Sequence, residues 1–252
     1  MTDIPHARPS ATAILARETG AEPELLMVKR NDRASFGGAF VFPGGVVEAV
    51  DECVSEFSSA LSSDEADTVL GLQGCGLGYF SAALRELFEE TGILLAASEY
   101  SDTQQRRVRE QLLAGELSWP ELLRQGKGQL LCGGLHYVSF WITPNALPKR
   151  YSTRFFVAEL TRQQDVSHQH GELTDSRWMS AATALKANDE SEIKLHFPTR
   201  ITLEGLAEHR TMAELMAWAK QRNADGVPCI YPELPDEDAV KRALGADHSR
   251  RE

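Results

Sequence analysis

The stretch from Arg85 to Ile93 concentrates residues that could bind a cation. It carries three glutamates, Glu86, Glu89 and Glu90, within five positions. On a helix that advances about 100° per residue, these three side chains fall on one face, and apolar side chains take the opposite face. The pattern predicts an amphipathic helix with a row of carboxylates.

These carboxylates need compensation, because like charges four residues apart on a helix are unfavourable by about a few tenths of a kcal/mol. Arg85 lies four residues before Glu89 and can pair with it. Glu86 and Glu90 then remain as hard oxygen donors of the kind that Mg²⁺ or Mn²⁺ prefers. A solvated acidic face is the alternative interpretation. Gly92 fits the left-handed residue that follows a helix end.

A glycine turn, Phe42-Pro43-Gly44-Gly45, precedes this helix in the sequence and is followed by Val46-Val47-Glu48. Glycines allow the backbone to approach a ligand closely, and a free carbonyl such as that of Gly44 can bind a metal. A plain turn is the alternative when the segment is considered alone.

Together, the turn and the helix resemble the signature of the Nudix hydrolases, G-x5-E-x7-R-E-U-x-E-E-x-G-U, in which U is a bulky aliphatic residue. Gly45 takes the first position, and Arg85 to Ile93 match every fixed position of the second half. The chain departs from the pattern in two ways. Asp51 stands where the family has glutamate, and 33 residues separate it from Arg85 where the pattern has seven.

The interruption can loop out between the turn and the helix, because the cost of loop closure grows only logarithmically with length. Residues 52–78 are rich in serine and glycine and contain one helix-compatible run, 66–72. We therefore expect the catalytic helix to begin near 79–81.

Other segments are similar to the interrupted-box branch that contains the peroxisomal coenzyme A diphosphatases, over most of residues 10–225. They are 141–144, 150–156, 178–180 and 197–200. This resemblance implies hydrolysis of the diphosphate of coenzyme A or acyl-coenzyme A, which releases 3′,5′-ADP and 4′-phosphopantetheine. The upstream pattern of bacterial coenzyme A pyrophosphatases is met only in part, because Lys29 and Ala34 replace two of its residues. Two alternatives stay open, an ADP-ribose or NADH diphosphatase and a Nudix-fold binding module without turnover.

The resemblance also implies roles for individual residues. Mg²⁺ or Mn²⁺ held by the three glutamates and the Gly44 carbonyl would neutralise the diphosphate and activate water. Glu89 and Glu172 are both candidates for the general base, and Arg85 is assigned to the catalytic group. Supporting roles fall to Gly45, Asp51 and Glu48, and Glu48 is predicted to pair with Arg85.

Four residues near the motif segments are candidates for substrate binding. They are Arg30, Arg33, Arg154 and Phe155. Each arginine could instead be a surface charge, and Phe155 could belong to the core. His168 and His170, which flank Glu172 in a polar loop, could be bases or ligands, although surface histidines in such a loop usually are neither.

Composition narrows the class of protein. The 252 residues carry a net charge of −11, which argues against nucleic acid or an anionic membrane as the main partner. The four cysteines form no C-x-x-C pair, and the N-terminus has no apolar targeting region, so the expected location is the cytoplasm. The expected binding partner is a small-molecule diphosphate, and the family resemblance adds the expectation that the protein forms a homodimer.

The order of predicted strands and helices predicts an α/β fold in which helices sandwich a mixed sheet, and the family resemblance implies that this α/β/α sandwich is of the Nudix type. We expect one Nudix domain over residues 1–225, with insertions at 52–78 and 101–130, followed by an extended acidic tail, 226–252. The predicted strands are 11–16, 24–29, 36–42, 93–95, 135–143, 154–159 and 176–179. The other predicted helices are 102–113, 119–124, 181–187, 198–209 and 212–222.

Overall fold

The computed structural model describes residues 6–31, 38–167 and 173–233. Its strands are β1 (Arg8–Arg17), β2 (Glu24–Arg30), β3 (Phe40–Val41), β4 (Gly44–Val46), β5 (Ala96–Ala97), β6 (Gln129–Leu130), β7 (His136–Ile142), β8 (Tyr151–Glu159), β9 (Leu173–Ser180) and β10 (Cys229–Ile230). The α-helices are α1 (Ser63–Leu70), α2 (Gly76–Thr91), α3 (Asp102–Leu113), α4 (Trp119–Gln125), α5 (Ala181–Asp189), α6 (Phe197–Leu206) and α7 (Met212–Asp225). Three short 3₁₀ helices are η1 (Ala49–Cys53), η2 (Ser55–Phe57) and η3 (Cys132–Gly134).

The main sheet is mixed and is centred on β1. Strand β1 runs parallel to β8 along nearly its whole length, and on its other edge it pairs antiparallel with β4 at one end and β2 at the other. The continuous order is β10-β7-β8-β1-β2-β3, and β9 pairs with the remaining edge of β2. The predicted α/β/α arrangement with a mixed sheet is confirmed.

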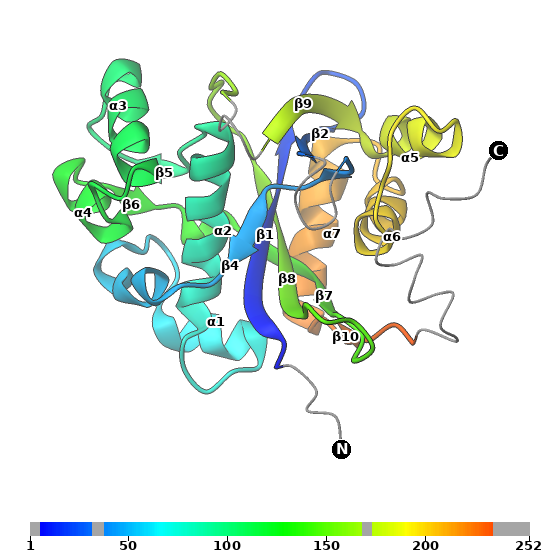
Figure 1. Cartoon of the computed structure of the whole chain (residues 1–252), viewed down its shortest axis with the longest axis horizontal. Coiled ribbons are helices and arrows are strands. Elements are labelled where there is room, and N and C mark those ends of the chain that lie inside the picture. Colours follow the sequence, from blue (N-terminus) through cyan, green and yellow to red (C-terminus); the bar gives the residue numbers. More distant parts are fainter. Residues whose placement is uncertain (1–5, 32–37, 168–172, 234–252) are drawn as a thin grey trace.

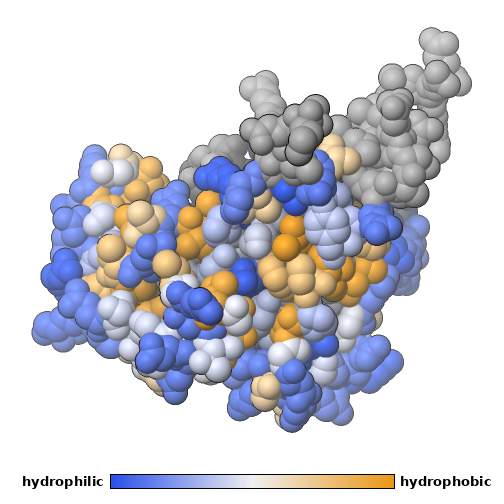
Figure 2. Space-filling view, turned by 90° about the horizontal axis from the view of Figure 1, so that it is seen from below, coloured by the Kyte–Doolittle hydropathy of each residue, from blue (hydrophilic) through white to orange (hydrophobic). Residues whose placement is uncertain are grey.

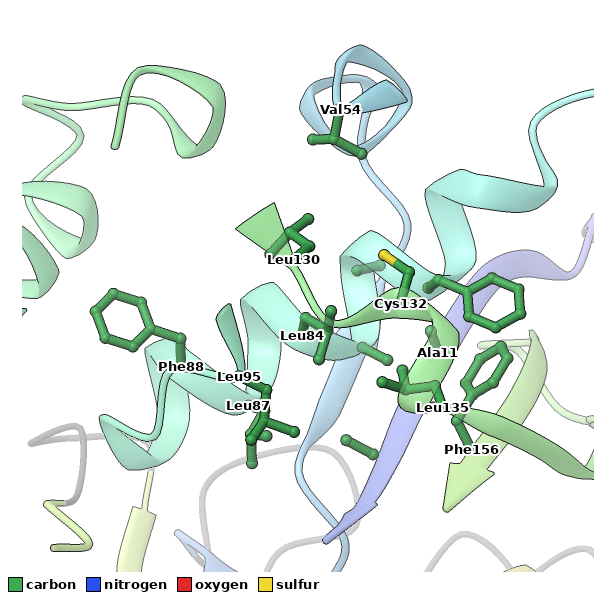
Figure 3. Packing of buried hydrophobic residues seen from close by; sticks show 14 of the residues in the cluster. Ala11, Val54, Leu84, Leu87, Phe88, Leu95, Leu130, Cys132, Leu135 and Phe156 are labelled. Carbon is green, nitrogen blue, oxygen red and sulfur yellow. The ribbon is translucent and has the colours of Figure 1, made fainter. Parts of the chain in front are cut away.

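Helices cover both faces of this sheet. Figure 1 shows α1 to α4 on one side of β1 and β8, and α5 to α7 on the other. Successive residues of β1 alternate between the two cores, as side chains of a strand must. Ala13 packs with α2 in the first core, whereas Ile14 packs with α5, α6 and α7 in the second. Figure 3 shows Leu84 and Leu87 of α2 in the same core as Phe156 of β8, with Leu135 next to Phe156.

Helix α2 begins at Gly76, three residues before the predicted range. Cys75, with φ of 63°, ends the preceding segment, and the N–H of Gly76 donates to Asp67 Oδ1 at 2.7 Å. A Cβ at Gly76 would lie 2.5 Å from the same oxygen, so glycine is needed for close contact with α1. Gly76 therefore serves packing, although in the sequence it looks like part of a break.

The predicted strand 93–95 is wrong. These residues are buried but lie outside the sheet, and the next two, Ala96–Ala97, pair with β6 in a separate two-stranded sheet. Their hydrophobicity reflects burial in the first core rather than strand formation. Of the predicted strand 36–42, residues 36 and 37 lie outside the described residues, and β3 covers Phe40–Val41.

Apart from one helix, the other predicted elements differ from the structure at their ends. The helix 102–113 is confirmed without change, and α6 ends at Leu206 rather than 209. Within the segment predicted as a tail, Cys229–Ile230 pairs in parallel with β7, and residues after 233 lie outside the described part of the chain. The division into a domain over 1–225 and a tail stays a prediction.

Candidate active site

The glycine turn lies directly against α2, although 33 residues separate Asp51 from Arg85. Gly44 pairs with Thr12 of β1, and a Cβ there would lie 2.5 Å from Ala11 O. At Gly45 a Cβ would collide with the carboxylate of Glu86. Both positions therefore require glycine for close approach, and the two halves of the split signature meet in space.

A buried ion pair joins the two sides of the interruption. Arg85 and Asp51 are 3% and 0% exposed. Arg85 Nε donates to Asp51 Oδ1 at 3.0 Å, and Nη2 donates to Oδ2 at 2.9 Å, so the contact is bidentate. Burial alone would lower the pKa of Arg85, but the hydrogen bonds and charge of Asp51 outweigh burial and raise it.

Further hydrogen bonds fix Asp51 in place. The hydroxyl of Ser81 donates to Asp51 Oδ1 at 3.0 Å, and Trp119 Nε1 donates to that hydroxyl at 3.1 Å. Trp119 belongs to α4, so the insertion 101–130 contributes to the support of the site. Asp51, which stands where the family pattern has glutamate, thus holds Arg85 through a buried hydrogen-bond network.

The predicted pairing of Glu48 with Arg85 is wrong. Within the described residues, the carboxylates paired with Arg85 are those of Asp51, Glu86 and Glu89. Glu48 is exposed, and its contribution is the backbone N–H, which donates to Asp51 Oδ2 at 2.9 Å.

Glu86 and Glu89 share one nitrogen of Arg85. Nη1 lies 3.0 Å from Glu86 Oε1 and 3.2 Å from Glu89 Oε2. The predicted pair of Arg85 with Glu89 is therefore present, and Glu86 joins it. Burial raises the pKa of Glu86 to about 7 and also raises the pKa of Glu89, because the charged carboxylates lose water.

Glu90 faces the glycine turn. The N–H of Gly44 donates to Glu90 Oε2 at 3.1 Å, and Arg30 Nη2 lies 3.8 Å from Oε1. The same nitrogen of Arg30 donates to Gly44 O at 3.0 Å. This carbonyl is the predicted metal ligand, and it keeps one acceptor position because a carbonyl oxygen has two lone pairs.

The charges at this site fit a divalent cation. Four carboxylates, those of Asp51, Glu86, Glu89 and Glu90, contact two guanidinium groups, those of Arg85 and Arg30. Two negative charges remain, and the donors are hard oxygens of the type that Mg²⁺ and Mn²⁺ bind. As the side chains lie, no three His, Cys, Asp or Glu residues in the described ranges form a closed ligand set.

A cavity of about 840 Å³ opens on the other side of the glycine turn. Its lining begins at Arg30, Gly44 and Gly45 and continues along β7, β8 and α6. Figure 2 shows hydrophobic side chains gathered on this half of the molecule, the side of α5 to α7. The principal apolar residues of the lining are Trp141, Leu147, Phe155, Phe197, Ile201 and Ile230.

The structure separates the predicted substrate-binding residues. Arg30 and Phe155 line the cavity, as a substrate-binding role would require. Arg154 does not, because neighbouring residues of a strand face opposite sides. It is 5% exposed and lies between the rings of Tyr79 and Phe140, at 4.3 and 4.4 Å.

Four of the predicted residues lie outside the described part of the chain. Arg33 lies in 32–37, and Glu172, with the neighbouring histidines His168 and His170, lies in 168–172, both outside the described residues.

A group of polar residues at the C-terminal end of α2 was missed by the sequence analysis. Arg109 of α3 donates through Nε and Nη2 to the carbonyl of Glu89, at 3.1 and 2.7 Å. Its Nη1 donates to Ser167 Oγ at 3.2 Å. Burial lowers the pKa of Arg109, which is 7% exposed. The last carbonyls of a helix have no partner within it, and Arg109 supplies one.

Two glutamines complete this group, which we name the α3 clasp (Gln105, Arg109, Gln164 and Ser167). Gln105 Nε2 donates to Gly92 O at 2.9 Å and to Gln164 Oε1 at 3.2 Å. The N–H of Ser167 donates to Thr91 O at 2.8 Å. Gln105 and Arg109 have the i, i+4 spacing of one helix face, but a solvated polar face has the same spacing, so the sequence could not reveal the clasp.

The NUDIX domain family matches residues 6–116, a range that includes the glycine turn and all of α2. Residues 6–116 therefore match a NUDIX domain. The resemblance to Nudix hydrolases that the split signature predicts is therefore confirmed, and so is its class as a hydrolase.

Two relatives align with most of this chain. A Xenopus laevis protein named acyl-coenzyme A diphosphatase NUDT19 is 24% identical, over 97% of this chain and 76% of its own. The Homo sapiens protein of that name is 25% identical, over 90% of this chain and 72% of its own. A NUDIX hydrolase structure from Alicyclobacillus acidocaldarius, 22% identical, has a TM-score of 0.68, covers 85% of this chain and 97% of its own, and supports the fold.

Within the described parts of the chain, no helix has both the length and the apolar character needed to cross a bilayer.

Proposed function

We propose that this protein hydrolyses the diphosphate linkage of coenzyme A or acyl-coenzyme A with the help of Mg²⁺ or Mn²⁺. The observation that carries the proposal is the contact of the Gly44–Gly45 turn with Glu86 and Glu90 at the edge of the 840 Å³ cavity. The names of the two NUDT19 relatives support this choice of substrate.

Glu86, Glu89, Glu90 and the Gly44 carbonyl are the groups that would hold the cation. When bound, a divalent cation offsets the negative charge of the diphosphate and lowers the pKa of water. Arg85, held by Asp51, keeps Glu86 and Glu89 on the same side of α2. Arg30, at the boundary between this site and the cavity, is placed to approach a diphosphate oxygen.

In the proposed reaction, the oxygen of a water molecule attacks one phosphorus, and the bond to the bridging oxygen breaks. Two phosphomonoesters leave. We assign Glu89 as the general base that accepts the proton of the water. Its side chain is 21% exposed and is therefore more accessible than those of Glu86, at 15%, and Glu90, at 5%. Glu172 is the alternative base.

The test is incubation with Mg²⁺ or Mn²⁺ and a panel of coenzyme A, acyl-coenzyme A, ADP-ribose and NADH. We expect the highest kcat/KM for coenzyme A or its thioesters, because preference is a ratio of transition-state affinities. A higher value for ADP-ribose or NADH would assign the enzyme to those substrates. No product from any compound, with metal bound, would assign the chain to a binding module without turnover.

Two further properties belong to this proposal. We infer a homodimer from the family resemblance, which light scattering would test by giving a mass twice that of the 27.8 kDa chain. The cytoplasm is the proposed location, and it is supported by four free cysteines.

A further inference from the structure

The cavity has two chemically different ends. At one end, Arg30 and Gly44 border the carboxylates of α2. At the other end, Trp141 and Phe197 meet edge to face, with ring centroids 5.7 Å apart and an angle of 85° between the rings. A ligand whose diphosphate lies at Gly44 can therefore place a second part of its structure on an aromatic surface.

Charge decides which part of a coenzyme A ester suits this cavity. Of the described residues that line it, Arg30 is the one arginine or lysine, and it lies at the diphosphate end. Glu233, another residue of the lining, adds negative charge. A 3′-phosphorylated adenosine needs cations around its phosphate, whereas a pantetheine arm and its acyl group are uncharged. The cavity therefore suits the uncharged arm.

The rest of the lining also matches an amide-containing arm that ends in a hydrocarbon. Thr12, Thr153 and Thr199 are lining residues, and a threonine hydroxyl can donate to or accept from an amide. Beyond them the lining is aliphatic and aromatic. Trp141 is fixed by the hydrogen bond from its Nε1 to Ser139 Oγ at 2.7 Å, so its ring is available as a rigid surface.

Phe197 marks the mouth of the cavity. Its side chain is a large hydrophobic group at the start of α6, is 57% exposed and packs against Trp141 of the cavity lining, so it extends the apolar lining to the surface. Pro198 follows it within the first turn, where proline favours helix initiation, so the backbone that carries the ring is restrained.

We propose that this cavity binds the pantetheine arm and that the acyl chain of an acyl-coenzyme A lies against Trp141 and Phe197. The inference rests on the proposed function and adds the orientation of the substrate. The thioester end enters the cavity, and the 3′-phosphoadenosine end lies outside it. Each methylene of the acyl chain that is buried against the aromatic pair then raises kcat/KM by up to about fourfold.

The first experiment compares kcat/KM for coenzyme A, acetyl-, hexanoyl- and octanoyl-coenzyme A in the wild type and in Phe197→Ala. In the wild type we expect kcat/KM to rise with chain length. In Phe197→Ala we expect about a tenfold loss for octanoyl-coenzyme A and less than about a twofold loss for coenzyme A. Leu113→Ala is the matched control, because Leu113 is also an exposed large hydrophobic residue but lies on α3, away from the cavity. An equal loss for all four substrates would overturn the proposal.

The second experiment separates this inference from the proposed function, because it needs no turnover. S-octanoyl-4′-phosphopantetheine and 3′,5′-ADP are titrated by calorimetry into the wild type and Phe197→Ala. We expect the variant to bind the octanoyl compound about tenfold more weakly and 3′,5′-ADP equally well. If the variant instead loses affinity for 3′,5′-ADP, the cavity holds the nucleotide and the orientation is reversed. If coenzyme A is hydrolysed but the octanoyl compound does not bind, the orientation fails while the enzyme assignment stands.

Discussion

The two faces of the central sheet differ in the number of charged residues that are buried against them. Every charged residue that is buried within the described part of the chain lies on the α2 side: Asp51, Arg85, Glu90, Arg109 and Arg154. On the α6 side, a largely apolar cavity contains one arginine or lysine among its described lining residues. The two faces meet at Gly44 and Gly45. This division indicates that the groups responsible for rate and those responsible for substrate preference can be changed separately.

Removal of a carboxylate from α2 should have the largest effect on activity. We expect Glu89→Gln and Glu90→Gln each to lower kcat by about 100-fold or more for every substrate, because both the metal and the proton acceptor depend on these groups. Urea titration should give an unfolding midpoint near that of the wild type. Glu48→Gln is the control, because Glu48 is exposed and makes no ion pair with Arg85. Near-normal turnover in either variant would remove that residue from the metal site.

Loss of Asp51 should affect stability as well as rate. Asp51→Ala leaves Arg85 buried without its bidentate partner, and we expect the free energy of unfolding to fall by about 3–5 kcal/mol. Denaturation in urea measures the change. Glu99→Gln breaks the exposed pair with Lys127, whose side chains are 67% and 72% exposed, and should cost at most about 1 kcal/mol. Similar losses in the free energy of unfolding for the two variants would mean that the buried Asp51–Arg85 pair stabilises the protein no more than an exposed pair.

The α3 clasp should have an intermediate effect. Arg109→Met leaves the Glu89 carbonyl without its partner, so we expect unfolding to become easier by about 1–3 kcal/mol. We also expect kcat to fall while KM changes little, because Glu89 loses its fixed position but the cavity is untouched. Arg109→Lys should restore part of kcat. Arg106→Met, at an exposed position of the same helix, serves as the control. A change in KM alone would contradict a positioning role.

The smallest expected effect is on the alkylation rate of cysteines. Cys132 lies in the core on the α2 side and Cys229 lies next to a residue of the cavity lining, so each reports on one face. Burial raises the pKa of Cys132 to about 11, and its side chain packs in the core beneath α2. Cys229 is exposed and precedes Ile230 of the cavity lining. In a Cys53→Ser, Cys75→Ser background at pH 8, S-octanoyl-4′-phosphopantetheine should slow alkylation of Cys229 a few-fold and leave Cys132 unreactive. The thiolate fraction of Cys132 grows only as pH approaches 11. An unchanged rate of Cys229 alkylation would place the ligand elsewhere.

Local patterns predicted the features that depend on neighbours in the sequence. The helix 102–113 follows from periodicity, and the pair of Arg85 with Glu89 follows from i, i+4 spacing. The role of Asp51 was harder to predict, because the choice between Asp51 and Glu48 depends on how η1 turns the side chains relative to α2.

Other features depend on contacts between distant segments. Arg154 is separated from the cavity by the alternation of β8, which cannot be assigned to faces until the sheet order is known. The start of α2 depends on Asp67 in α1, and the clasp depends on α3 folding back over the end of α2. Such contacts leave no periodic signal in the sequence.

The bidentate pair of Asp51 and Arg85 links residues on either side of the interruption, and the stretch 71–75 inside it is almost entirely exposed. A protease cut in that stretch would therefore produce two fragments whose attachment does not depend on the severed peptide bond. The catalytic groups would stay in register, because the fragments would still be joined by the shared sheet and by this ion pair. Interruptions of different length can be exchanged at this point in the chain for the same reason.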